Sequence, residues 1–254
     1  MERGTLIHAR LCGTWAEEVA PIPADAVDAS SLSTLKAYAD AIGAKRRRSA
    51  SEQREEIRAT QPDVVFADEI DADGKILVSA EQVADVERIA QAVLTNPYAA
   101  GMLADCEPEM SAHWIETHEG ADIGAKARAD LLHSSALVDI KTTSRRDLLD
   151  GPEAFAKAAF NFGWHRQLEW YSRGFGTRPA YYFIVVYVGD PALCEVYEMS
   201  PDFIEIGRDA NDLALDRIAS WIRHSDGWQG PSADANGRPT ITTAHPLPWM
   251  LRNR

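Results

Sequence analysis

The chain has 254 residues, of which 45% are apolar; this length and apolar fraction suit one domain with a substantial core. The formal net charge of −13 excludes generic coating of nucleic acid. No apolar run approaches bilayer length and the N-terminus lacks a signal peptide's apolar core, so we expect a cytoplasmic protein without a membrane segment. Cys12, Cys106 and Cys194 are far apart and form no C-x-x-C pair, which argues against zinc, a disulfide framework and a four-cysteine iron–sulfur cluster.

The N-terminal part of the chain is predicted to be mainly helical. Two helical stretches, 32–42 and 51–59, flank the basic run 45–48. This helix–basic loop–helix order faintly resembles SAP-type DNA-binding modules, which indicates a small helical insert at about 30–62. The alternative is that the basic run is simply a solvated charged face.

The middle of the chain begins with a turn and a long helix. Segment 69–74 resembles an EF-hand loop, but Ala80 stands where the loop needs a bidentate glutamate, so we predict a turn. Apolar residues keep helical spacing over 83–94. Two short apolar segments, 125–132 and 136–142, are separated by a tight polar joint and therefore predict a β-hairpin.

The C-terminal half alternates between helix and strand. We predict a helix over 152–175 entered through Pro152, strands at 181–188 and 194–199, a helix over 206–222, and a Gly/Pro/Ser-rich tail at 225–247 that packs on the core. Together these elements predict an α/β (α+β) fold, with a mixed sheet of three or four strands flanked by helices.

The predicted hairpin carries three charged residues in the pattern D-x8-D-x-K. Side chains alternate along a strand, so Asp139 and Lys141 share one face while Ile140 turns towards the core. If Asp130 ends the neighbouring strand, two carboxylates and an ammonium converge. Paired carboxylates suit a hard divalent cation. A surface salt-bridge cluster is the alternative that the residues alone leave open.

Further motifs accompany the hairpin in a fixed order. They are GTLIHARL at 4–11, the long helix at 81–103, EPEMSAHW at 107–114, the hairpin itself and HRQLEWY at 165–171. This order resembles the PD-(D/E)xK nuclease superfamily, and within it the phage recombination exonucleases of the RecE (exonuclease VIII) type. The resemblance covers nearly the whole chain and implies a restriction-endonuclease-like core in a single domain, 1–254, with the insert noted above.

The chain departs from the family pattern in two places besides the insert. Ala129 stands where the family has the proline of "PD", a tolerated change because the carboxylate alone binds metal. Relatives usually carry a further segment before the G-T-x-x-H helix, whereas three residues precede it here. We therefore expect either a misassigned start or a trimmed form of the protein.

The resemblance implies roles for individual residues. His8 would join Asp130, Asp139 and the carbonyl of Ile140 as a metal ligand, although a lone histidine on an apolar helix face is more commonly structural. Candidates for further roles are Lys141 as the residue that positions or deprotonates the nucleophile, Gln167 as a contact to phosphate or water, and Glu109 as a second-metal or outer ligand. Tyr171 shares a helix face with Gln167, and packing is an equal alternative for it.

The implied activity is hydrolysis of DNA with Mg²⁺, or Mn²⁺ as a substitute, 5′ to 3′ from the ends of a linear duplex. The implied product is a 3′ single strand for a strand-annealing partner protein, and the implied assembly is a homo-oligomeric ring of three or four subunits. No G-x4-G-K-[ST] motif is present, so we expect no built-in ATP motor. A single-strand or internally cutting nuclease of the same fold, or a non-catalytic DNA-binding module, are the alternatives.

Overall fold

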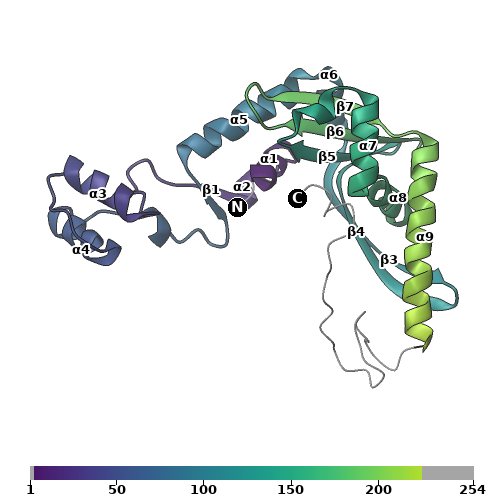
Figure 1. Cartoon of the computed structure of the whole chain (residues 1–254), viewed down its shortest axis with the longest axis horizontal. Helices are drawn as coiled ribbons and strands as arrows, with labels where there is room; N and C mark the ends of the chain where they lie inside the picture. Colours follow the sequence, from purple (N-terminus) through teal and green to yellow (C-terminus); the bar gives the residue numbers. More distant parts are fainter. Residues whose placement is uncertain (1–2, 225–254) are drawn as a thin grey trace, which may run out of the picture.

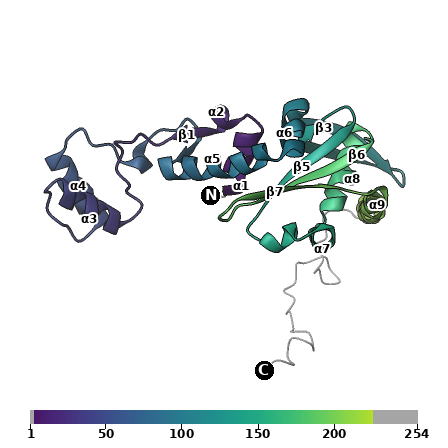
Figure 2. The ribbon, with the colours of Figure 1, turned by 90° about the horizontal axis from the view of Figure 1, so that it is seen from above.

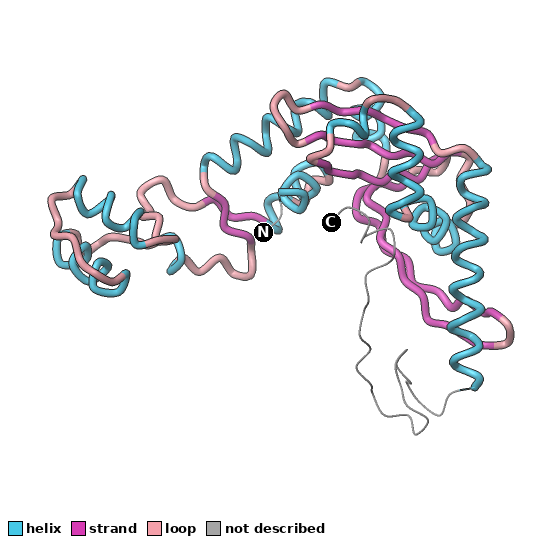
Figure 3. The backbone as a smooth tube through the Cα atoms, in the orientation of Figure 1, coloured by secondary structure: helices cyan, strands magenta, loops and turns pink. Residues whose placement is uncertain are grey.

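The computed structural model describes residues 3–224, so the predicted packing of the tail at 225–247 lies outside them. Helices cover both faces of a five-stranded mixed sheet (Figures 1 and 3), which confirms the predicted fold class. The sheet consists of β3 (Glu107–His118), β4 (Ala121–Leu132), β5 (Ala136–Thr143), β6 (Ala180–Tyr187) and β7 (Leu193–Glu198). The flanking helices are α1 (Arg3–Leu11), α5 (Ala80–Thr95), α6 (Pro97–Asp105), α7 (Pro152–Phe162), α8 (Trp164–Phe175) and α9 (Pro201–His224).

The strands lie in the sheet in their sequence order. All neighbours are antiparallel except β5 and β6, which are parallel and are connected through α7 and α8. Strands β3 and β4 form a long hairpin that runs beside α9 (Figure 1). Its two-residue turn, Glu119–Gly120, has positive φ at both positions, as a tight hairpin turn of matching twist requires.

Each face of the sheet has its own apolar core. Different helices cover the two faces (Figure 2). On one face, Val138 and Ile140 of β5 pack with α1, α5 and α6. On the other, Leu137 packs with residues of α7, α8 and α9. Because successive side chains of a strand point to opposite faces, alternate residues of β5 pack against different groups of helices.

Most predicted elements are present, with three main differences. The long helix expected at 81–103 is two helices, α5 and α6, because Asn96 caps the start of α6 and Pro97 is its first residue. Strand β3 was not predicted; every second residue along much of it is exposed, so it lacks a continuous apolar run. The predicted helix over 152–175 is two helices, because Gly163 adopts the left-handed conformation (φ 72°) that ends α7 and begins α8. The predicted turn at 69–74 is confirmed at Asp73–Gly74.

A helical lobe, residues 22–75, projects from the end of the molecule opposite β3 and β4 (Figure 1). Its main helices are α3 (Leu32–Ala41) and α4 (Ala50–Thr60), and it also contains the short helix η1 (Ala67–Glu69). It is flanked in the chain by helix α2 (Trp15–Glu18), strand β1 (Val19–Pro21) and strand β2 (Ile76–Val78). Its core is separate from those of the sheet and centres on Leu35, Ile57 and Phe66. Strands β1 and β2 pair in parallel and connect the lobe to the rest of the chain.

Two of the four residues in the basic run 45–48 form ion pairs within this lobe. Arg46 donates to Asp40 at 2.9 Å and Arg47 forms an ion pair with Glu56. Lys45 and Arg48 form no ion pair among the described residues, so whether the run contacts DNA stays a prediction. Within residues 3–224, no helix is both long and apolar enough to cross a membrane.

Candidate active site

Strands β4 and β5 separate at the point where the hairpin motif begins. They pair at two positions next to the connecting turn. In the same register the next pair would be Asp130 with Asp139, but here the ladder stops and Oδ2 of Asp130 accepts a hydrogen bond from the N–H of Ile140 at 2.7 Å. This split opens the sheet, so that groups from helices on both of its faces can approach the two carboxylates.

Alternation along β5 arranges the motif as predicted. Ile140 is buried in the core below α1, whereas Asp139 and Lys141 point to the opposite face. Nζ of Lys141 lies 2.5 Å from Oδ2 of Asp139, and the Asp139 side chain is only 1% exposed. The surface salt-bridge alternative therefore does not describe this pair, because one partner is in the interior.

Burial, and then the charge of Asp130, raise the pKa of Asp139 to about 7, with Lys141 acting in the opposite direction. Oδ2 of Asp139 has no hydrogen-bond partner, since the nearby ammonium is not aligned with it. A buried carboxylate oxygen without a donor is energetically costly. Such an atom is well suited to face a cation.

Helix α8 supplies the groups that hold this pair. Gln167 donates from Nε2 to Oδ1 of Asp139 at 2.8 Å and accepts at Oε1 from Nζ of Lys141 at 2.8 Å. The same amide nitrogen lies 2.7 Å from the hydroxyl of Tyr171, one helical turn further on. Gln167 thus fixes both charged groups, which is more than the contact to phosphate or water that its motif suggested.

Helix α1 brings His8 to the split from the other face of the sheet. Its Nε2 lies 2.9 Å from the carbonyl oxygen of Ile140, and its Nδ1 lies 3.8 Å from Oδ2 of Asp130. The helix approaches β5 closely at Gly4, where an added Cβ would lie 2.9 Å from Oγ1 of Thr142. The glycine of the G-T-x-x-H motif therefore has a steric reason, since a larger residue would push His8 away.

Glu109 reaches the same region from β3. Its backbone has φ 54°, a left-handed conformation that is strained for a residue with a side chain, and the β3–β4 ladder is interrupted there. Oε2 of Glu109 lies 2.8 Å from Nε of Arg128. No sequence pattern indicates this ion pair or the role of Cys12, which is four residues from His8 and lies beside Glu109.

These residues line one cavity of about 430 Å³. A second cavity, of about 590 Å³, shares Arg128 and Asp130 with it and continues over the β3–β4 hairpin past Lys126 and Tyr171. Tyr171 therefore lines a cavity in addition to packing. Arg173 forms ion pairs with Glu116, Glu169 and Asp212, so its charge is compensated within the fold.

The donor set fits a hard divalent cation. Asp130 and Asp139 supply carboxylate oxygens, the Ile140 carbonyl supplies a neutral oxygen, and the His8 imidazole lies beside them. The buried Oδ2 of Asp139 is the strongest sign of this fit, because it meets no hydrogen bond of regular geometry and faces only the Lys141 ammonium.

The sequence matches no protein-family profile and no curated protein. Two solved structures are similar in outline. One is a proposed exonuclease from Eubacterium rectale, with 12% identity and a TM-score of 0.47, over 87% of this chain and 78% of that one. The other is the protein SSO0001, with 14% identity and a TM-score of 0.32, over 88% of this chain and 95% of that one.

Proposed function

We propose that this protein is a divalent-metal-dependent deoxyribonuclease that degrades linear duplex DNA from its ends. The observation that carries the proposal is the convergence of Asp130, Asp139, Lys141 and Gln167 on one cavity at the split between β4 and β5. The 5′ to 3′ direction, a homo-oligomeric ring and a strand-annealing partner are proposed from the resemblance of the motifs to the RecE type. A cytoplasmic location is proposed from the widely spaced cysteines, which do not suit a disulfide framework.

The cation would be Mg²⁺, or Mn²⁺ in its place, held by Asp130, Asp139, the Ile140 carbonyl and His8. When bound, it polarises the scissile phosphate and lowers the pKa of water. The chain itself supplies Lys141, whose ammonium has three N–H groups. One is given to Gln167, and the ammonium lies 2.5 Å from Asp139 without a regular hydrogen bond to it. An N–H group is thus left for the attacking water or for charge that develops on the phosphate.

The adjoining cavity suits the path of a DNA strand. Lys126 offers positive charge to backbone phosphates, while the overall charge of −13 disfavours unspecific binding elsewhere. Binding localised to this path would weaken as salt rises, with a slope set by few phosphate contacts.

End-labelled linear duplexes and covalently closed circles, incubated with Mg²⁺ or with EDTA, test the proposal. Linear DNA should be digested completely and closed circles left intact, with no cleavage in EDTA. A 5′ label should leave at once on short products, whereas a 3′ label should persist on long single strands. Nicked circles or a preference for single strands would instead favour an internally cutting or single-strand nuclease.

Variants of the motif separate metal binding from the chemical step. Asp130→Ala and Lys141→Ala should each lower the cleavage rate by ~10²-fold or more. Calorimetric titration with Mn²⁺ should show weaker binding in Asp130→Ala and unchanged binding in Lys141→Ala, because the ammonium is not a ligand. Arg145→Ala, an exposed basic residue paired with Asp147, is the matched control and should keep both properties. Wild-type cleavage by both variants would disprove the assignment.

A further inference from the structure

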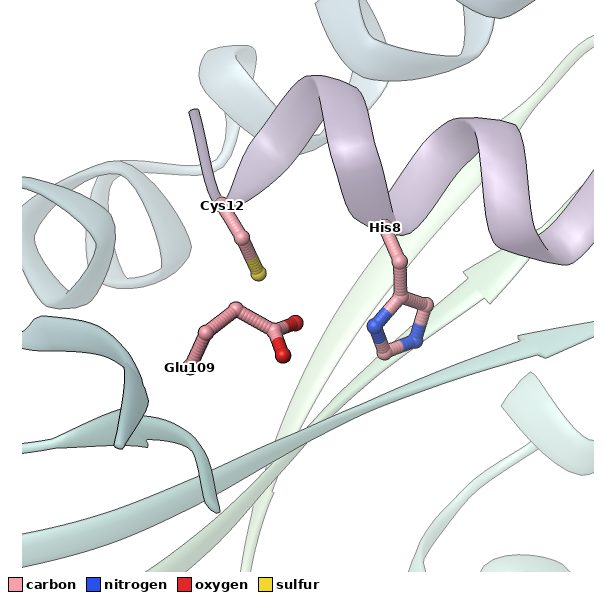
Figure 4. Close-up of side chains that lie close together, drawn as sticks. All are labelled: His8, Cys12 and Glu109. Atoms are coloured by element: carbon pink, nitrogen blue, oxygen red, sulfur yellow. The ribbon is translucent and has the colours of Figure 1, made fainter. Parts of the chain in front are cut away.

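Three side chains with different donor atoms meet beside the proposed catalytic carboxylates (Figure 4). His8 and Cys12 are four residues apart on and just after α1, and therefore share a face of the helix. Glu109 faces them from β3. One ligating atom from each of the three lies within 4.8 Å of the other two. The sequence argues against zinc because its cysteines form no C-x-x-C pair. This cluster needs no such pair, since its other two ligands are a histidine and a glutamate and the glutamate comes from a distant strand.

The hydrogen bond made by His8 determines which of its nitrogens can bind a cation. The Ile140 carbonyl can only accept, so Nε2 at 2.9 Å carries the proton in a neutral ring. The lone pair is then on Nδ1, which lies on the side of the ring nearer to Glu109 and Cys12 in Figure 4. Histidines that bind metals commonly donate their other N–H to a backbone carbonyl in this way.

We propose that His8, Cys12 and Glu109 form a site for a thiophilic divalent cation of the Zn²⁺ and Co²⁺ class, with Asp130 as the fourth ligand. Oδ2 of Asp130 lies 3.8 Å from Nδ1 of His8. Tetrahedral zinc with N, O and S ligands keeps neighbouring donor atoms ~3.5 Å apart. Side-chain shifts of ~1 Å would therefore bring His8, Cys12 and Glu109 to this spacing, and Asp130, which lies outside their 4.8 Å group, would turn a carboxylate oxygen towards the ion.

The carboxylate of Glu109 is already oriented towards the cluster. Arg128 contacts its Oε2 at 2.8 Å, which orients the carboxylate and leaves Oε1 for the cation. The strained backbone at this residue directs the carboxylate to the cluster instead of continuing the β3–β4 ladder.

The thiol must lose its proton when the cation binds. In the metal-free protein, burial and the nearby Asp130 and Glu109 raise the pKa of Cys12 to about 12, so the group is a neutral thiol. On binding, the S–H bond breaks, the proton goes to solvent and the sulfur forms a bond to the cation. The carboxylates that disfavour an isolated thiolate attract a dication, so they favour the bound form.

Occupation of this site would compete with the proposed catalytic cation. A neutral imidazole has one lone pair, so His8 serves one cation at a time. Asp130 is also shared. This regulatory consequence rests on the proposed function, whereas the binding of the cation does not.

Titration of the EDTA-stripped, reduced full-length protein with Co²⁺, without DNA, tests the site. A thiolate-to-cobalt charge-transfer band in the near ultraviolet should saturate at one equivalent and disappear when Zn²⁺ displaces the cobalt. Cys12→Ser should abolish the band, and Cys106→Ser, a partly buried cysteine elsewhere in the same core, should keep it. Glu109→Gln should keep the band but weaken Co²⁺ binding by ~10-fold or more.

Several outcomes would overturn the proposal: a missing band in the wild-type protein, a band that persists in Cys12→Ser, or unchanged affinity in Glu109→Gln. If Cys12→Ser loses cooperative thermal unfolding, His8→Ala takes its place and should weaken Co²⁺ binding by ~10-fold or more. Zn²⁺ should also inhibit Mg²⁺-dependent cleavage of DNA. A band without any DNA cleavage would disprove the nuclease while supporting the site, and cleavage without a band would do the reverse.

Discussion

Asp139 combines deep burial with an incomplete set of hydrogen bonds. Its Oδ1 is satisfied by Gln167, while Oδ2 has an ammonium nearby but no aligned donor. The metal-free fold therefore carries a local energetic cost at the residue that the proposed chemistry most needs. Such costs are typical of functional sites, where activity and stability favour different residues.

The first prediction concerns stability and pH at this residue. The pKa of Asp139 is about 7 in the folded protein and 3.8 ordinarily, so the folded state holds this proton more tightly than the unfolded chain does. The resulting contribution to the free energy of unfolding is complete below about pH 4 and is lost as the pH rises to about 7. Asp139→Asn removes this loss. In EDTA at pH 8 the variant should be more stable than wild type by on the order of 2 kcal/mol, with little difference at pH 4.5, and it should be inactive.

Urea denaturation across this pH range measures the effect. Asp63→Asn, at an exposed position in the lobe, is the matched control and should follow the wild-type profile. Parallel profiles for wild type and Asp139→Asn would contradict the prediction.

The sequence correctly predicted which side chains lie together where the regular repeat of a strand or helix determines their direction. Alternation on β5 correctly paired Asp139 with Lys141, and four-residue spacing correctly paired Gln167 with Tyr171. The left-handed backbone of Glu109 could not be predicted, because the residue is not glycine and its conformation depends on the neighbouring strand. The roles assigned to these residues stay predictions until the experiments above are done.

At the scale of elements, the position of α8 depends on how closely α9 crosses it. A Cβ added at Gly207 of α9 would lie 2.6 Å from the carbonyl oxygen of His165 in α8. Backbone atoms cannot rotate away as a flexible side chain can. Glycine therefore sets the distance between two helices, one of which carries Gln167.

The second prediction follows from this contact. Gly207→Ala should lower the free energy of unfolding by ~1–3 kcal/mol, because α8 and α9 must move apart. It should also lower DNA cleavage by displacing Gln167. Gly101→Ala in α6 meets open space and should instead raise stability by ~0.5–1 kcal/mol, since alanine restricts the unfolded chain more than glycine does.

Thermal and urea denaturation of the two variants, with cleavage assays on the same preparations, provide the measurement. Equal effects of the two substitutions would mean that helix propensity, and not the crossing of α8 and α9, governs both positions.

The elements themselves were largely predictable, but the split between β4 and β5 was not. Segments with a continuous apolar run, such as β6, or with regular helical spacing, such as α5, were identified from the sequence. The split depends on where Asp130 takes over a hydrogen bond from the ladder. That choice reflects the twist of the whole sheet, which no local pattern contains.

At the scale of the whole molecule, the lobe and the sheet are two structural units. The lobe has its own apolar core, and its ion pairs are largely internal. The chain leaves through β1 and returns through β2, and these two strands pair with each other. The ends of the lobe are therefore close enough to be joined by a short linker.

The third prediction is that the sheet folds without the lobe. Replacement of residues 24–73 by ~8 residues of Gly and Ser should leave cooperative unfolding and Mg²⁺-dependent cleavage of a short linear duplex. Circular dichroism and the labelled-duplex assay measure both properties. In the full chain, Leu35→Ala should cost the lobe ~2–5 kcal/mol and leave the unfolding of the sheet unchanged. Loss of the whole fold in either variant would show that the two units are not independent.

The hydrogen bond between His8 and Ile140 spans 132 positions of the chain. During synthesis His8 therefore leaves the ribosome long before its partner exists, and Gln167 follows still later. Contacts of such long range form late in folding, because closing a long loop costs entropy that few early contacts repay. An intermediate that has formed only the β4–β5 hairpin would contain Asp130, Asp139 and Lys141 without the groups that orient them. Under the proposed function, cleavage of nucleic acid would therefore begin only after the tertiary fold is complete.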